Sequence, residues 1–280
     1  MPLLFGTSGP PRSSPERSTE AGVRRVRELG LGCMEVEFVQ GVRMSGETAG
    51  RVRAAADETG VRLTCHAPYY VNLASKEERK IRDSIKRIFE SARVGALCGA
   101  DGVVFHPGFY MGKDAGEVYT MIRRGMESVI EKMREAKMSG VWLRPELTGK
   151  PSQFGDVDEL LRLSRDLEMV LPTIDFSHLY ARTAGECNSY GSFAAVLEKT
   201  GSELGDAALR NMHIHLSGIE YGPKGERRHL PVEGAGFRYR DVIRALVDFE
   251  VEGRVVTESP CLEDDALLFQ NCWLELAGKR

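Results

Sequence analysis

The stretch LTCHAPYYVNLASKEERKIRDSIKRIFESARVGALCGADGVVFHP, residues 63–107, contains the pattern that decides the fold. It begins with a short apolar run typical of a β-strand, continues through a long segment with helical spacing of its apolar residues, and ends with a second short apolar run. Each apolar run closes on a histidine, His66 in the first and His106 in the second. The stretch is therefore predicted to be a strand, a helix and a strand, with a polar side chain at each strand end.

The same alternation extends along the chain in both directions. Runs rich in apolar and β-branched residues begin at eight positions: Leu3, Cys33, Leu63, Gly102, Val141, Leu171, Met212 and Arg254. Nearly every gap between them holds an amphipathic helical pattern, as in residues 17–30 and 156–168. Eight strands that alternate with helices predict one α/β domain over residues 1–280, a (β/α)8 TIM barrel.

Length and composition narrow the alternatives. A chain of 280 residues fits one barrel or two domains, and no linker or low-complexity stretch marks a second domain. A doubly wound open sheet would usually carry a glycine-rich phosphate turn after its first strand, and GTSGPP at residues 6–11 is a poor match. With 42% hydrophobic and 28% charged residues, the chain is not disordered or collagen-like.

Several features bear on the cell compartment and on partners. No apolar run approaches the length that crosses a bilayer, and the first residues hold too short an apolar stretch for a signal peptide. The six cysteines are scattered without a CxxC pair, as expected of reduced thiols. We expect a cytoplasmic monomer with no membrane contact. Because the net charge is −3, any binding of nucleic acid requires a local basic patch.

Histidines gather at the predicted carboxyl ends of the strands, which is where TIM barrels place their active sites. Five of the six lie late in a predicted strand or just beyond it: His66, His106, His178, His213 and His215. His213 precedes His215 by two residues, so it shares a strand face with His215 but lies deeper in the barrel. We expect His213 to support the site or to pack in the core.

Carboxylates end three further strands, at Glu146, Asp175 and Glu258. An acid at the end of an apolar strand is costly to bury unless it is paired, hydrogen-bonded or bound to a cation. Each of these residues alone could form a structural hydrogen bond or a salt bridge, but their convergence on one mouth favours a metal. Imidazole and carboxylate together suit Zn, Mn or Fe. Eight or nine candidate ligands exceed the four to five that zinc usually takes, so two or three ions are predicted.

Six motifs resemble, in order, those of the endonuclease IV group of apurinic/apyrimidinic endonucleases, within the xylose-isomerase-like barrel superfamily. They are HAPYYVNLAS from His66, FHPG with His106, PEL with Glu146, IDFSH with Asp175 and His178, HIHLS with His215, and TESP with Glu258. The resemblance covers most of the chain. It implies a xylose-isomerase-like barrel that uses zinc, with manganese as an alternative, to hydrolyse the phosphodiester 5′ to abasic sites in DNA, a step of base excision repair.

The resemblance also implies how the ligands are shared among ions. His66 and His106 would hold one zinc, and Glu146 would bridge it to a second and orient the attacking hydroxide as the catalytic residue. The second ion would be completed by Asp175, His215 and Glu258. A third ion would be bound by His178.

One stretch departs from the family pattern. The family completes the third site with an Asp-x-His pair ahead of a glycine-rich turn, and the matching residues 225–236 read GERRHLPVEGAG. Glu226 takes the aspartate position, Arg228 falls where the histidine is expected, and His229 lies one place later. Either a local shift lets Glu226 and His229 act as the pair, or Arg228 serves as a phosphate clamp.

The family inserts side chains into the duplex to flip the abasic sugar out of the stack. Tyr69 and Tyr70 match positions used in that way, and adjacent aromatic rings beyond a ligand suit stacking against bases. The alternative is that one of the two tyrosines packs inward. Arg43, in the loop after the second strand, is a further candidate wedge.

Two other functions compete with the nuclease. A sugar isomerase or epimerase on the same barrel would use one ion, bound by Glu146, Asp175, His215 and Glu258, while the two glutamates move protons beside a carbonyl. A noncatalytic binder of damaged DNA would keep the barrel but lack a competent set of metals. The number of ions per chain separates the first alternative from the nuclease.

Overall fold

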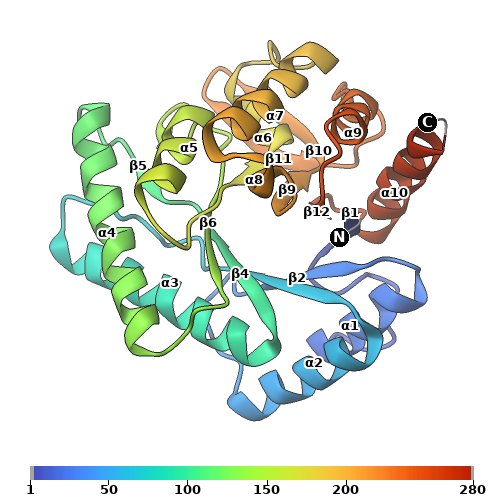
Figure 1. The fold of residues 1–280 in the computed structure, drawn as a ribbon, viewed down its shortest axis with the longest axis horizontal. Coiled ribbons are helices and arrows are strands. Elements are labelled where there is room, and N and C mark those ends of the chain that lie inside the picture. The colour runs from blue at the N-terminus through green and yellow to red at the C-terminus, as the bar shows by residue number, and fades with distance from the viewer. Residues whose placement is uncertain (1–2, 279–280) are drawn as a thin grey trace.

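The strands at the centre of the molecule are parallel and form a barrel. The computed structural model describes residues 3–278, and in it eight strands pair in the order β6-β4-β3-β2-β1-β12-β9-β8. Figure 1 looks down this barrel, with the strands at its centre and the helices around them. The strands are β1 (Leu3–Ser8), β2 (Cys33–Glu37), β3 (Arg62–His66), β4 (Ala100–Phe105), β6 (Trp142–Pro145), β8 (Thr173–Asp175), β9 (Met212–Leu216) and β12 (Gly253–Thr257). Each coincides with one of the eight predicted runs.

Two bridges join the ends of the strand order, β6 and β8. Leu143 pairs with Val170 and Glu146 pairs with Thr173, both in parallel. The amide of Leu147 also donates to the carbonyl oxygen of Thr173 at 3.0 Å. The predicted (β/α)8 barrel is therefore confirmed, and the open doubly wound sheet is excluded.

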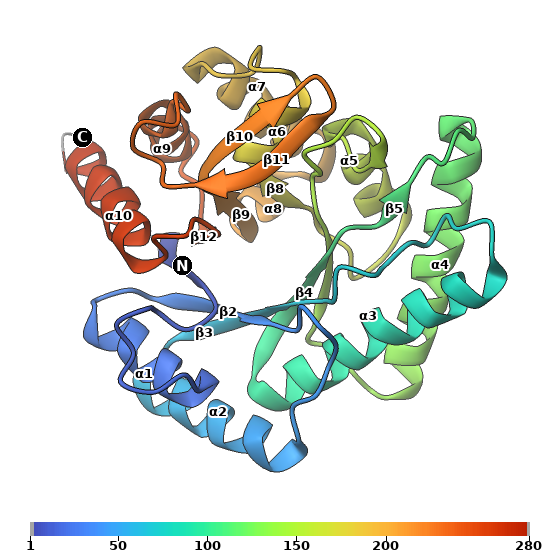
Figure 2. The same cartoon turned by 180° about the vertical axis from the view of Figure 1, so that it is seen from behind.

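Helices separate the barrel strands along the chain and cover their outer surfaces, as both views show (Figures 1 and 2). They are α1 (Thr19–Glu28), α2 (Gly46–Thr59), α3 (Glu78–Cys98), α4 (Ala115–Glu135), α5 (Val157–Asp166), α6 (Phe176–Arg182), α7 (Tyr190–Leu204), α8 (Asp206–Leu209), α9 (Tyr239–Asp248) and α10 (Glu263–Ala277). Local sequence sets their ends: Asp156 and Glu159 form a capping box at the start of α5, and Gly99 ends α3 with a φ of 87°. Within residues 3–278, no helix is long and apolar enough to cross a membrane.

Two small antiparallel pairs add to the barrel beyond its strand ends. β5 (Gly108–Phe109), which follows β4, pairs with β7 (Gln153–Phe154), which follows β6. β10 (Gly218–Gly222) and β11 (Gly225–Leu230) form a hairpin directly after β9. Figure 2 looks onto the side of the barrel where this hairpin lies. The hairpin therefore stands at the end of the barrel where the active sites of this architecture occur.

Charged side chains cross the amino-terminal half of the barrel interior. Arg254 of β12 donates to both carboxylate oxygens of Asp101 in β4, at 2.6 and 2.9 Å. β12 and β4 are four places apart in a ring of eight strands, so this bond spans the interior. The buried Arg144 of β6 donates to the backbone and side-chain oxygens of Asn211. Ionic and polar contacts thus fill the floor below the mouth.

We expect Asp101→Asn to destabilise the fold by about 3 to 5 kcal/mol, because it leaves the buried Arg254 guanidinium without its counter-charge. Urea unfolding of the metal-free protein measures the loss. Glu58→Gln, which breaks the exposed 2.7 Å pair with Arg24, is the matched control and should leave the urea midpoint nearly unchanged, because water screens an exposed ion pair. Similar small losses in both variants would contradict the assigned role of Asp101.

Candidate metal centre

The parallel strands all end at one mouth, and this brings the predicted ligands together. Most of them end a barrel strand or follow within three residues of its end, and two come from the β10–β11 hairpin. The side chains that meet there are His66, His106, Glu146, Asp175, His178, His215, Glu226, His229 and Glu258. Residues far apart in the sequence therefore share one cluster, as the barrel prediction required.

Glu146 lies at the centre of the cluster and is fully buried. Its Oε2 is 3.1 Å from Nε2 of His66 and 2.9 Å from Nε2 of His106. Its Oε1 is 3.2 Å from Nδ1 of His215. Because each carboxylate oxygen faces different imidazoles, Glu146 is placed to bridge two cations.

A second group of ligand atoms surrounds Oε1 of Glu146. Glu146, Asp175, His215 and Glu258 each offer one atom, and these atoms all lie within 4.8 Å of one another. Nδ1 of His215 is 3.5 Å from Oε2 of Glu258. Donors that share one zinc at about 2.0–2.2 Å are themselves about 3 to 4 Å apart, so the spacing fits a single ion.

A third group joins the barrel to the hairpin. His178, His229 and Glu258 offer ligand atoms within 4.8 Å of one another. Oε2 of Glu226 is 3.5 Å from Nε2 of His178, and its Oε1 is 3.8 Å from Nε2 of His229. Glu226 and His229, which belong to the stretch that departs from the family pattern, thus lie where they would complete the ligand shell of a third cation.

A β-bulge explains how Glu226 and His229 reach the same site. Glu220 pairs with Arg228, but the next residue of β10, Tyr221, pairs with Glu226. Arg227 is therefore an extra residue in β11. In a regular strand residues three apart face opposite sides, whereas one extra residue restores them to the same side. The bulge makes the E-x-x-H spacing equivalent to an E-x-H pair.

Gly149 gives Glu226 the room that it occupies. A Cβ at Gly149 would lie 2.6 Å from Cβ of Glu226 and 3.0 Å from Cδ2 of His178, closer than such atoms approach. The amide of Glu226 donates to the carbonyl oxygen of Gly149 at 2.9 Å. The loop after β6 thus fixes the start of β11 against the mouth.

The charges of the cluster favour cations at its centre. Burial lowers the pKa of His66, but the hydrogen bond to Glu146 and the nearby carboxylates outweigh this and raise it to about 10. Burial also lowers the pKa values of His178 and His215, but neighbouring carboxylates outweigh burial and raise both values. Burial would raise the pKa of Glu258, yet His215 holds it at about 2. Divalent ions would supply the positive charge that these carboxylates otherwise draw from protonated imidazoles.

Buried polar atoms without partners also fit bound metals. Asp175 Oδ2 and His178 Nε2 are buried and make no hydrogen bond within residues 3–278. The proton positions agree: Nδ1 of His66 contacts the Ala67 carbonyl oxygen at 2.7 Å and Nδ1 of His178 contacts that of Leu147 at 2.9 Å. Because a carbonyl oxygen only accepts, both Nδ1 atoms carry the proton, and Nε2 is free to bind a cation.

Two carboxylates near the cluster, Glu35 and Glu37, are not among the residues predicted from the sequence. Glu35 is fully buried beneath the mouth. Burial alone would raise its pKa, but the nearby His215 and His213 outweigh this effect and hold the pKa well below the usual value. Glu37 accepts a hydrogen bond from Ser8 at 2.8 Å, and burial raises its pKa to about 8. The alternation in CMEVE, residues 33–37, places both acids on one strand face and could have identified them. His213 is buried in the interior, as expected.

The residues predicted to contact DNA lie around the mouth. Tyr69 is 57% and Tyr70 72% exposed, so neither packs inward. Arg43 is exposed in the loop between β2 and α2. Arg228 is exposed on the hairpin, and its Nε is 2.7 Å from Oε2 of Glu220. Each of these side chains is available to a ligand at the mouth.

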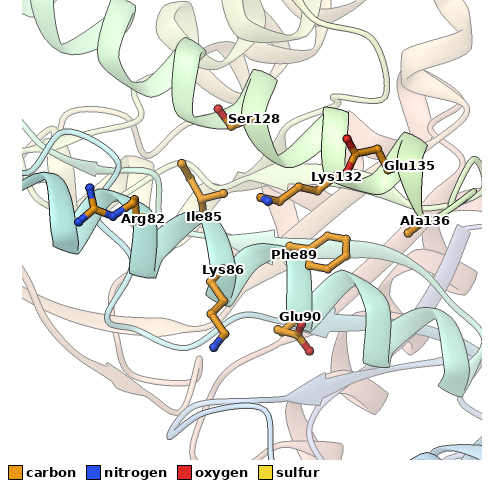
Figure 3. A pocket seen from close by; sticks show the side chains of 9 residues that line it. All are labelled: Arg82, Ile85, Lys86, Phe89, Glu90, Ser128, Lys132, Glu135 and Ala136. Atoms are coloured by element: carbon orange, nitrogen blue, oxygen red, sulfur yellow. The ribbon is translucent and has the colours of Figure 1, made fainter.

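Three surface pockets border α3. One lies on the outer wall between α3 and α4, where Ile85, Phe89 and Lys132 line it (Figure 3). A second is lined in part by Tyr69 and Tyr70, and a third by Val42, Pro68 and Arg87. None of the three is lined by a residue of the ligand cluster, so the cluster itself marks the mouth as the candidate site.

The sequence matches the family described as "Xylose isomerase-like TIM barrel" over residues 23–271. It is 46% identical over 274 residues to an uncharacterized protein of Methanocaldococcus jannaschii, covering 98% of each chain. It is 28% identical over 250 residues to a "Probable endonuclease 4" of Symbiobacterium thermophilum, covering 84% of this chain and 87% of the relative. These relatives span nearly the whole barrel.

Solved structures of two functional classes share the fold. A D-tagatose 3-epimerase-like protein superposes with a TM-score of 0.75 at 19% identity, covering 99% of each chain. Endonuclease IV from Thermus thermophilus superposes with a TM-score of 0.72 at 20% identity, covering 96% of this chain and 99% of that one. Two such close scores do not choose between an epimerase and a nuclease.

We expect two variants of β11 to differ in metal content. Deleting Arg227 removes the extra residue, so Glu226 and His229 become next-but-one neighbours on the same face and the ion count should not change. Exchanging Arg228 and His229 keeps the bulge but turns the histidine away, and one ion should be lost. Native mass spectrometry of the zinc-loaded proteins measures the count. Equal zinc content in both variants would contradict the bulge explanation.

Proposed function

The chain belongs to the xylose isomerase-like TIM barrel family, and on this premise we propose that it is a metal-dependent endonuclease. Its substrate would be DNA that contains abasic sites, and it would hydrolyse the phosphodiester 5′ to the lesion in base excision repair. The observation that carries the proposal is that, of four possible ligand groups among residues 3–278, three lie at one mouth and two of these share Glu146. A single-ion enzyme does not need the third group.

We assign the ligands to three positions, with zinc as the first candidate and manganese as the alternative. His66 and His106 would hold the first ion and share Glu146 with the second. The second would be completed by Asp175, His215 and Glu258, and the third would be held by His178 with Glu226 and His229. Ions bound there would lower the pKa of water toward neutrality and offset the charge that develops on the phosphate.

The side chains would contribute to hydrolysis through position and charge. Glu146 sits between the first two groups and would orient the attacking water toward the phosphorus. Its burial excludes bulk water, so its interactions are stronger than they would be at the surface. The bonds of His66 and His178 to backbone carbonyl oxygens fix both rings before substrate arrives.

The rim of the mouth would hold the duplex. The exposed rings of Tyr69 and Tyr70 would stack against bases beside the lesion, and Arg43 would enter the duplex from the loop after β2. Arg228 would exchange its contact with Glu220 for a phosphate, which its guanidinium can bind through two hydrogen bonds. The molecule as a whole is acidic, so these local contacts matter for binding.

An epimerase is the second candidate, favoured by one observation. The group of Glu146, Asp175, His215 and Glu258 is complete by itself for a single ion, and an epimerase-like structure superposes as well as a nuclease does. The presence of His66, His106 and the hairpin pair at ligand distance supports the nuclease instead. A noncatalytic DNA binder is the third candidate.

We expect the zinc-loaded protein to cut a duplex that carries one tetrahydrofuran abasic analogue on its 5′ side and to leave a 3′ hydroxyl. A denaturing gel reads the cleavage, and a strong chelator should abolish it. Glu146→Gln should lower the rate by about 100-fold or more, because it removes the shared carboxylate charge. Glu131→Gln, on the exposed face of α4, is the control and should cut normally.

Other outcomes would identify a competing function. One bound ion, an intact duplex and C3 epimerisation of a ketose would establish the epimerase. Tight binding of the abasic duplex without cleavage, in zinc, manganese, cobalt and magnesium, would establish the binder. Full cleavage by protein shown to be free of metal would overturn the proposed chemistry.

We expect Tyr69→Ala and Tyr70→Ala each to weaken binding of the abasic duplex by about tenfold, since stacking on one base contributes about 1 to 3 kcal/mol. Fluorescence anisotropy measures the affinity, and the zinc content should remain unchanged. The Tyr→Phe variants keep the rings and should bind nearly as well as the original protein. Undiminished binding by both alanine variants would place the duplex elsewhere.

A further inference from the structure

A buried polar group lies directly beneath the mouth and has no part in the function proposed above. It consists of Glu35 on β2, Thr64 on β3 and His213 on β9, each at most 1% exposed. β2 and β9 are three places apart in the ring of strands, so the contact between Glu35 and His213 crosses the barrel interior. A charge in such a place requires partners, and its partners indicate its role.

The two oxygens of Glu35 have different partners. Oε2 accepts a hydrogen bond from Oγ1 of Thr64 at 2.9 Å and lies 3.0 Å from Nε2 of His213. Oε1 makes no hydrogen bond within residues 3–278, and it faces Nε2 of His215 at 3.2 Å. One oxygen is thus held by two groups, and the other is directed at a ligand histidine.

His215 is oriented differently from His66 and His178. His66 and His178 place Nδ1 on a backbone carbonyl oxygen, which leaves Nε2 for a cation. His215 instead has Nδ1 toward Glu146 and Glu258, at 3.2 and 3.5 Å. Its Nε2 faces Oε1 of Glu35 at 3.2 Å and Nε2 of His213 at 3.1 Å, and of these two only the carboxylate carries a negative charge. For His215 to bind a cation through Nδ1, its proton must be on Nε2, and a carboxylate there selects that tautomer.

We propose that Glu35 is a positioning residue, which accepts the Nε2 proton of His215 and so presents Nδ1 to the second ion. Thr64 and His213 hold the carboxylate in place through its other oxygen. The proposal rests on the assignment of His215 as a metal ligand in the proposed function. Glu35, His215 and the second ion would then form a series of carboxylate, imidazole and metal. The series begins below the mouth and ends at the ion shared with Glu146.

NMR of the histidine ring nitrogens tests the proposal without any substitution. The sample is the zinc-loaded protein labelled with ¹⁵N in its histidines. We expect His215 to carry its proton on Nε2 and to bind zinc through Nδ1, while His66 and His178 carry theirs on Nδ1. A proton on Nδ1 of His215 would overturn the proposal. So would two unprotonated nitrogens on this ring, because they would indicate a further ion held by Glu35, His213 and His215.

Glu35→Gln provides the second test, since the amide has the same shape and cannot accept from both sides as the carboxylate does. We expect one zinc per chain to transfer to a chelator about 10 to 100 times faster, as when other partners of ligand histidines are removed. Glu131→Gln makes the same chemical change on the exposed face of α4 and is the control, with a change of less than about threefold expected.

Thermal unfolding of the metal-free variants separates positioning from a merely structural role. The proposal would be overturned if the metal-free form of Glu35→Gln unfolds at a lower temperature while its zinc-loaded form releases zinc at the original rate. The proposed function fails independently if the original protein binds no zinc through His215. If it binds zinc there and Glu35→Gln changes neither the release rate nor the ring protonation, only the positioning role fails.

Discussion

Mutual repulsion among buried carboxylates is the constraint on which the rest of the structure depends. Glu146, Asp175 and Glu258 converge at the mouth because parallel strands end together, and Glu35 lies just below them. Acids this close, away from water, require positive charge between them. In the protein alone, imidazoles supply it by taking protons. The cluster is therefore built for a centre more positive than a neutral imidazole can provide.

The scaffold meets this constraint with a rigid wall and a filled interior. Strand hydrogen bonds fix each ligand relative to its neighbours, and the Arg254–Asp101 pair closes the interior below them. Backbone carbonyl oxygens contact the rings of His66 and His178. At His215, a carboxylate oxygen of Glu35 lies 3.2 Å from Nε2. Such fixed surroundings limit the reorganisation that accompanies binding of a cation.

The sequence predicted the eight strands and the convergence of the ligands because both follow from periodicity. An apolar run that ends in His66 or Glu146 is visible without knowledge of the fold. Glu35 was missed because it lies inside a strand rather than at its end, where only the barrel interior explains an acid. The partner of His178 on the hairpin could not be decided, since the side on which His229 lies depends on the pairing of β11 with β10.

The extra residue in β11 has a consequence for how related proteins are recognised. A lineage that gains one codon in this hairpin keeps the same constellation in space while its spacing in the alignment changes. A motif search that requires a fixed number of residues between the acid and the histidine would reject such chains as lacking the site. Relatedness in this family is better judged by which side chains share a strand face than by the number of residues between them.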